Sequence, residues 1–121
     1  MALGVVTELG LGIATLVLVP LGRPSGAIPG DGRIVYVAHA LFGAALVVGA
    51  SVLVVASRRS GRVARVGAVL GASGVLLGAL GGLLTVSHPA RPAGLAVMLL
   101  GSVVATVGYL GAAMEVTPGG A

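Results

Sequence analysis

Apolar residues fill four long runs of the chain, and polar residues gather in the short segments between them. A run of about 20 apolar residues is long enough to cross the hydrocarbon core of a bilayer as a helix. Helices also satisfy their own backbone groups where no water is present. The pattern therefore predicts an all-α integral membrane protein. We expect a four-helix transmembrane bundle that forms one domain over residues 1–121, with spans at approximately 3–21, 34–56, 66–87 and 94–114.

The segments between the runs carry the residues that end helices. Gly22–Arg33 contains two prolines together with Pro-Gly and Asp-Gly pairs, which are typical of turns. Ser57–Arg65 is a short basic loop, and His88–Ala93 is a tight connection with two prolines. Glu115–Ala121 forms a short C-terminal tail. Because only six residues join the third and fourth spans, we expect these two helices to be antiparallel neighbours.

Small residues form a stripe along each of the last two spans. Residues three and four apart share one helix face, and in membranes such small-residue faces are where helices approach closely. We expect the two stripes to face each other, so that Gly78→Leu would push the helices apart. The alternative is that one stripe faces outward and forms a homodimer seam. The predicted packing residues are Gly67, Gly71, Gly74, Gly78, Gly81, Gly101, Ala105 and Gly108.

The composition agrees with a membrane protein and excludes several classes of function. Hydrophobic residues make up 57% of the chain and charged residues only 8%, whereas soluble domains average about 25% charged residues. Cysteine is absent, which excludes disulfides, thiolate metal sites and cysteine nucleophiles. No serine has a histidine and a carboxylate at a matching depth, so we expect no enzyme and no catalytic residue. The hydroxyl side chains inside the spans are expected to bond their own helix.

The arginines predict the orientation. All seven basic residues are arginine, and four of them lie in one loop, at Arg58, Arg59, Arg62 and Arg65. Such a loop is better explained as a cytoplasmic anchor than as a nucleic-acid surface. Both termini would then be cytoplasmic. An arginine-rich, lysine-free chain also suggests a bacterium of high GC content, and hence the bacterial inner membrane.

Glu8 is the most informative single residue, because an ionisable group within a span is costly and is a functional-site hypothesis by default. Gly12 and Thr15 follow it on the same helix face. One interpretation is a site for a proton or another cation. The other is an interfacial carboxylate that caps the first helical turn or pairs with an arginine of the loop 57–65.

His39 and His88 are predicted to lie toward the outer side of the membrane. Two such histidines raise the possibility of bis-imidazole haem ligation, with Gly43 leaving room for a porphyrin. Against haem, helical rise places His39 about 9 Å and His88 about 18 Å from the membrane centre. The alternatives are interfacial histidines bonded to loop carbonyls or water, or a proton site. We expect no metal site, because two histidines are too few ligands.

The layout of four short spans with a carboxylate in the first resembles the small multidrug resistance transporters. That resemblance implies a proton-coupled carrier of cations in which Glu8 is the binding carboxylate. The sequence departs from the family in its aromatic content, since Tyr36, Phe42 and Tyr109 are its only aromatic residues. Cation binding uses aromatic faces.

Three functions remain open. The first is an accessory or structural subunit that acts through helix–helix contacts, with itself as a homo-oligomer or with a larger membrane complex. The second is a small proton-coupled transporter that uses Glu8. The third is a haem or quinone redox subunit that uses His39 and His88. The first needs no cofactor, and only the third needs haem.

Overall fold

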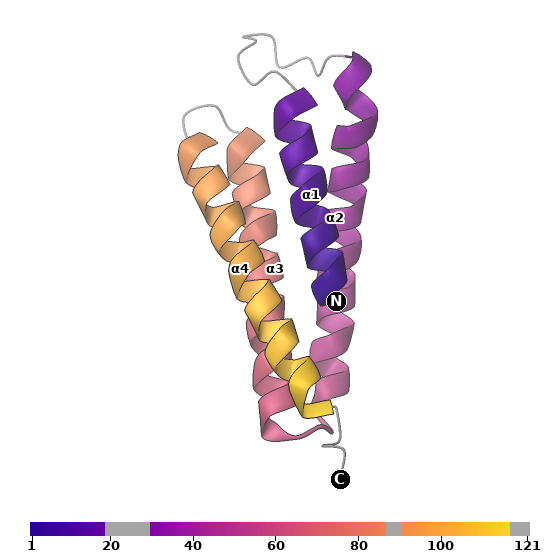
Figure 1. Cartoon of the computed structure of the whole chain (residues 1–121), viewed down its shortest axis with the longest axis vertical. Coiled ribbons are helices and arrows are strands. Elements are labelled where there is room, and N and C mark those ends of the chain that lie inside the picture. Colours follow the sequence, from indigo (N-terminus) through magenta and orange to yellow (C-terminus); the bar gives the residue numbers. More distant parts are fainter. Residues whose placement is uncertain (19–29, 87–90, 117–121) are drawn as a thin grey trace.

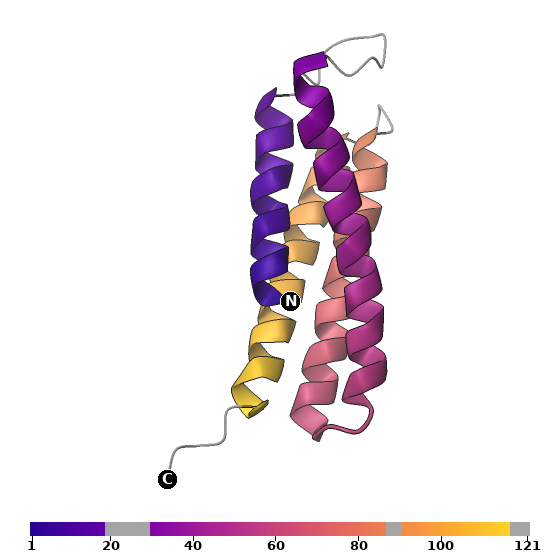
Figure 2. The same ribbon diagram turned by 90° about the vertical axis from the view of Figure 1, so that its right-hand side faces the viewer.

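The computed structural model describes residues 1–18, 30–86 and 91–116, and these residues form an all-helical chain. Its helices are α1 (Ala2–Leu18), α2 (Gly30–Ser57), α3 (Arg62–Val86) and α4 (Arg91–Val116). They run up, down, up and down along one long axis (Figure 1). The view turned by 90° shows α1 beside α4 and α2 beside α3 (Figure 2). Each helix also packs on the next one along the chain, and the contact between α1 and α4 closes the bundle.

Three of these helices have the length and hydrophobicity needed to cross a membrane. Their apolar segments are Arg33–Ser57, Arg62–Thr85 and Pro92–Met114, with 25, 24 and 23 residues. In contrast, α1 has 17 residues, or about 26 Å at a rise of 1.5 Å per residue, against a hydrocarbon core of about 30 Å. The expectation of four full spans therefore holds for three helices, and the first helix is shorter.

The short helix is also offset along the bundle. Its N-terminal end lies beside the middle part of α2 rather than at the end of the bundle (Figure 1). Consistent with this position, the Met1 side chain lies 3.4 Å from where a Cβ on Gly49 would be. Residues of α1 therefore face the middle and upper part of α2, toward its N-terminal end. This offset decides which side chains meet.

The C-terminal ends of three segments predicted as loops are helical in the structure. Asp31 and Gly32 lie in the first turn of α2, Arg62 and Arg65 in the first turn of α3, and Arg91–Ala93 in the first turn of α4. The predictions of turns at these positions were wrong because a first helical turn does not need intrahelical partners for its N–H groups. Such a turn accepts glycine and proline, as well as arginine.

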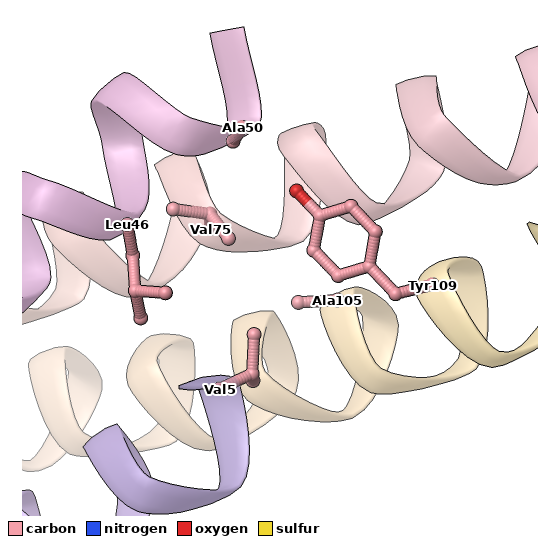
Figure 3. Close-up of a cluster of buried hydrophobic side chains, with 6 residues drawn as sticks. All are labelled: Val5, Leu46, Ala50, Val75, Ala105 and Tyr109. Carbon is pink, nitrogen blue, oxygen red and sulfur yellow. The ribbon is translucent and has the colours of Figure 1, made fainter. Parts of the chain in front are cut away.

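Most large aliphatic side chains lie on the outside of the bundle, as lipid-facing residues do. Leu83 is 70% exposed and Val48 64% exposed. The core is small, and all four helices contribute to it (Figure 3). It consists of Val5, Leu46, Ala50, Val75, Ala105 and Tyr109.

Candidate functional site

Glu8 of α1 and His39 of α2 meet inside the bundle. The Nδ1 atom of His39 lies 2.9 Å from Oε1 of Glu8, which is an ion-pair distance. The two side chains are only 18% and 19% exposed. One proton shared between a carboxylate and an imidazole at this distance leaves the two groups together uncharged, which offsets part of the cost of placing them in apolar surroundings.

Two glycines make room for this pair in a reciprocal arrangement. Gly12 follows Glu8 by four residues and faces the imidazole: a Cβ there would lie 3.4 Å from Cε1 of His39. Gly43 follows His39 by four residues and faces the carboxylate: a Cβ there would lie 2.8 Å from Oε1 of Glu8. Each helix therefore presents one ionisable side chain and, one turn later, the gap that receives the other helix's side chain.

The pair lies in the half of the bundle that is farther from the α2–α3 turn, since His39 is six residues from the start and eighteen from the end of the apolar segment Arg33–Ser57. Gly43, against which the carboxylate packs, is ten residues from the start and fourteen from the end of the apolar segment Arg33–Ser57. Pairing of Glu8 with an arginine of the loop 57–65 was one of the expectations, and it is wrong in this structure. Because α1 is offset along α2, the carboxylate reaches His39 well away from that loop.

Two polar atoms of the pair, one on each side chain, have no hydrogen-bond partner among the described residues. Oε2 of Glu8 is buried and has no hydrogen-bond partner among them. Nδ1 of His39, although close to Oε1, makes no aligned hydrogen bond within the same part of the chain. A buried polar atom without a partner costs free energy, so these two atoms mark a place suited to a proton, a water molecule or a small cation.

The predicted partner of His39 in haem ligation, His88, lies outside the described residues. The described part of the chain contains no group of three or more histidine, cysteine, aspartate or glutamate residues that could hold a metal. Among the described residues, Glu8 and Gly12 lie close to the His39 imidazole. The geometry thus joins His39 to the carboxylate of α1.

The glycine stripes of α3 and α4 lie against each other. A Cβ on Gly74 would lie 2.6 Å from the carbonyl oxygen of Gly101, and one on Gly81 would lie 2.7 Å from that of Gly94. From the other side, a Cβ on Gly108 would lie 2.9 Å from the carbonyl oxygen of Gly67. These distances leave no room for a side chain, so backbone packs directly on backbone along this seam.

Gly78 departs from the pattern. A Cβ on Gly78 would meet no heavy atom of the described chain within 4 Å, apart from the backbone of α3 itself. The backbone of Gly78, however, is closely approached by Gly101. Gly78 therefore contributes its backbone to the seam, as predicted, a methyl group there would not touch α4, and the separation of the helices by Gly78→Leu stays a prediction. Its Cα lies in the seam, where Gly101 approaches it, but a Cβ on Gly78 would point away from α4.

The arginines of the α2–α3 turn and the hydroxyl side chains within the helices lie outside this site. The arginines Arg58, Arg59, Arg62 and Arg65 are exposed around the α2–α3 turn, where Nη2 of Arg65 donates to the carbonyl of Arg58 at 2.9 Å. As expected, hydroxyl side chains donate to the carbonyl four residues earlier in their own helix. They are Thr7, Thr15, Ser51, Ser73, Ser102 and Thr106.

Sequence reasoning picked out Glu8, Gly12, His39 and Gly43 separately and missed that they form one site. A signal was present in the chain, because Glu8 and Gly12 have the same spacing of four as His39 and Gly43. Comparison with known proteins adds no relative: no family model, no curated protein and no solved structure matches the chain.

Proposed function

We propose that this protein is a small proton-coupled membrane carrier and that the Glu8–His39 pair is its proton site. The observation that supports this proposal is the 2.9 Å contact between His39 Nδ1 and Glu8 Oε1 inside the bundle, with Oε2 buried and unpartnered in the described chain. Ionisable residues are kept inside membrane segments chiefly where they move protons or bind ions.

Charge balance explains how such a pair would exchange a proton for a cation. With one proton held between them, the carboxylate and the imidazole together carry no charge. Loss of that proton leaves a charge of −1, which an entering monovalent cation neutralises at Oε1 and Oε2 of Glu8. One proton released for each cation bound keeps the site neutral, and a neutral site has the lower desolvation cost in apolar surroundings.

For the orientation we propose that the arginine-bearing α2–α3 turn faces the cytoplasm, so that α4 ends on that side and α1 starts from that direction, at mid-height of the bundle. Arg58, Arg59, Arg62 and Arg65 lie within about one helical turn of that connection and are exposed, as the positive-inside rule requires. The membrane would be the inner membrane of a bacterium. A fluorescence reporter fused to the C-terminus, which is bright only in the cytoplasm, would test the orientation.

Purified protein in liposomes tests the function. Gradients of Na⁺, K⁺ or tetraphenylphosphonium are imposed in turn, and an internal pH dye reports proton movement. At least one gradient is expected to drive protons through the wild-type protein. Glu8→Gln should reduce this flux at least tenfold, and Glu8→Asp should retain part of it. Thr7→Val, a neighbouring change on an exposed position, should behave as wild type.

The proposal fails if none of the three gradients drives protons through the wild-type protein. It also fails if Glu8→Gln transports as well as the wild type. Equal loss in Glu8→Gln and Thr7→Val would mean that α1 tolerates no change, and would likewise contradict a specific role of the carboxylate.

A second candidate is an accessory subunit, and its support comes from glycines that the bundle leaves uncovered. Cβ atoms on Gly78 and Gly82 of α3 would meet nothing within 4 Å in the described chain. A glycine face of this kind allows another membrane helix to approach closely. Purification in mild detergent would then yield a stable oligomer or a copurifying membrane protein, and Gly82→Ile would abolish the association. A strictly monomeric sample without a partner contradicts this candidate.

A further inference from the structure

Tyr109 of α4 is the aromatic residue at the centre of the bundle. It is 4% exposed and belongs to the core cluster with Leu46 and Val75. Its ring lies over Gly71 of α3, where a Cβ would be 2.7 Å from Cδ1 and would displace the ring. The glycine stripe of α3 thus does two things: it admits the backbone of α4, and at Gly71 it admits this phenol ring.

The Tyr109 hydroxyl has no hydrogen-bond partner among the described residues. Phenylalanine would fill the same space without burying a polar atom, and an unpartnered buried hydroxyl is a net cost. A hydroxyl placed in an otherwise apolar cluster therefore points to a polar partner that is not a side chain of this cluster. Water is the simplest one, since buried waters join polar groups that the protein leaves unpaired.

The ring orientation directs the hydroxyl toward α2, the helix that carries His39. It leaves α4 and points between Ala50 and Val75, toward the side on which Leu46 lies (Figure 3). That direction follows from helix geometry, because side chains lean toward the N-terminus of their own helix. On α2, Ala50 and Gly43 share a face and are seven residues apart, which is about 10 Å at helical rise. Glu8 packs on Gly43 at the far end of this interval.

Leu46 lies between the two polar groups on that face of α2. It is 8% exposed, and one of its methyl groups lies 3.0 Å from where a Cβ on Gly4 would be. The order along this face is therefore the carboxylate at Gly43, the aliphatic side chain of Leu46, and the hydroxyl beside Ala50. Three waters, each about 2.8 Å from the next, would be needed to cover the interval.

We propose that the Tyr109 hydroxyl relays protons between the Glu8–His39 pair and the arginine-bearing end of the bundle, with Leu46 as the apolar barrier between them. This inference rests on the proposed transport function. A proton leaves the pair for a water molecule, a water molecule donates a proton to the Tyr109 oxygen, and the hydroxyl gives its own proton to a water on the α2–α3 side. The phenol is neutral before and after, so no charge is left in the core.

Tyr109→Phe tests the relay by removing one oxygen atom. In the liposome assay it should lower cation-driven proton flux at least tenfold, while cation binding to the detergent-solubilised protein and its melting temperature stay at wild-type values. Tyr36→Phe is the matched control, because Tyr36 lies in the first turns of α2, outside this core, and should keep wild-type flux.

The barrier is tested separately. Leu46→Ala should raise the proton leak measured without any cation gradient about fivefold, and the milder Leu46→Val should raise it less. An unchanged leak in both variants contradicts the barrier.

The outcomes separate the relay from the function on which it rests. Wild-type flux in Tyr109→Phe together with lost flux in Glu8→Gln overturns the relay and leaves the transport proposal standing. Wild-type flux in both variants overturns both. Lost flux in Tyr109→Phe with a lowered melting temperature assigns the tyrosine to packing and overturns the relay.

Discussion

Glycine serves opposite purposes at the two helix–helix contacts of this bundle. Between α3 and α4 the glycines receive backbone: the Cβ positions of Gly74 and Gly81 are occupied by carbonyl oxygens of the facing helix. Between α1 and α2 they receive polar side chains: Gly43 accommodates the carboxylate of Glu8, and Gly12 the imidazole of His39. The first contact is closed to any side chain, and the second encloses ionisable groups.

This difference separates stability from chemistry within one small chain. Without a hydrophobic drive between membrane helices, close backbone packing is what holds α3 to α4. The α1–α2 contact gives up some of that closeness to hold a carboxylate and an imidazole, which are expensive in apolar surroundings. Substitutions at the seam should therefore act on stability, and substitutions at the pair should act on the protonation and transport properties.

The largest effect is expected at the seam. Gly74→Ala places a methyl group against the backbone of Gly101 and Ala105, which cannot move without separating the helices. We expect a loss of about 2 kcal/mol in the free energy of unfolding, typical of overpacking. Gly78→Ala, the matched control in the same helix, should change it by less than about 0.5 kcal/mol. Equilibrium unfolding in mixed micelles measures both, and equal effects would contradict the direction assigned to the Gly78 Cα–Cβ bond.

An intermediate effect is expected from breaking the pair. Glu8→Gln and His39→Gln each leave one ionisable partner without its opposite charge, so each should destabilise the protein. The double variant should lose less than the sum of the two, with a coupling energy of about 1 kcal/mol for groups in contact. A double-mutant cycle in the same unfolding assay gives this coupling. Additive losses would show that the two side chains do not interact.

A smaller effect on stability, but a clear one on the site, is expected from Gly43→Ala. The new methyl group would lie 2.8 Å from Oε1, and the carboxylate is the mobile end of a flexible side chain. It should move away from His39 at a cost below about 1 kcal/mol. Infrared spectra of the carboxyl group should then differ from wild type. Gly10→Ala, whose Cβ meets no described atom within 4 Å, should leave them unchanged; a shift in both variants would contradict the contact.

The smallest effect is expected at the α2–α3 turn. Arg65→Ala removes the hydrogen bond from Nη2 to the carbonyl of Arg58, which is exposed. Exposed interactions of this kind contribute about 0.5 kcal/mol, so the melting temperature should fall only slightly and proton flux should not change. A loss of flux would mean that this arginine belongs to the transport site.

The helices and the small-residue stripes could be predicted because both depend on local pattern. An uncharged run such as 66–86 has no other stable form in a bilayer, and a spacing of three and four puts glycines on one face. The helix ends were harder, since Asp31, Gly32 and Arg62 are all acceptable in a first turn. The direction of a single Cα–Cβ bond, as at Gly78, needs the position of the facing helix.

The pairing of Glu8 with His39 could not be predicted because it depends on the offset of one helix along another. Periodicity fixes which residues share a face, but not how far α1 is displaced along α2. With its start beside Gly49, α1 places Glu8 at the level of His39 and Gly43; any other offset would place the carboxylate against a different part of α2. The position of Tyr109 could not be predicted for a similar reason, since its place in the core depends on Gly71 of another helix.

The most direct test of the central claim is the distance between the Glu8 carboxyl carbon and Nδ1 of His39 in lipid bilayers. Solid-state NMR with ¹³C-labelled glutamate and ¹⁵N-labelled histidine can measure it, with His88 and Glu115 replaced by glutamine so that one label of each kind remains. A contact of 2.9 Å between Nδ1 and Oε1 predicts a carbon–nitrogen distance of about 4 Å and strong dipolar dephasing. A distance beyond about 6 Å, outside the range of a direct charge interaction, would contradict the pair and the function proposed for it.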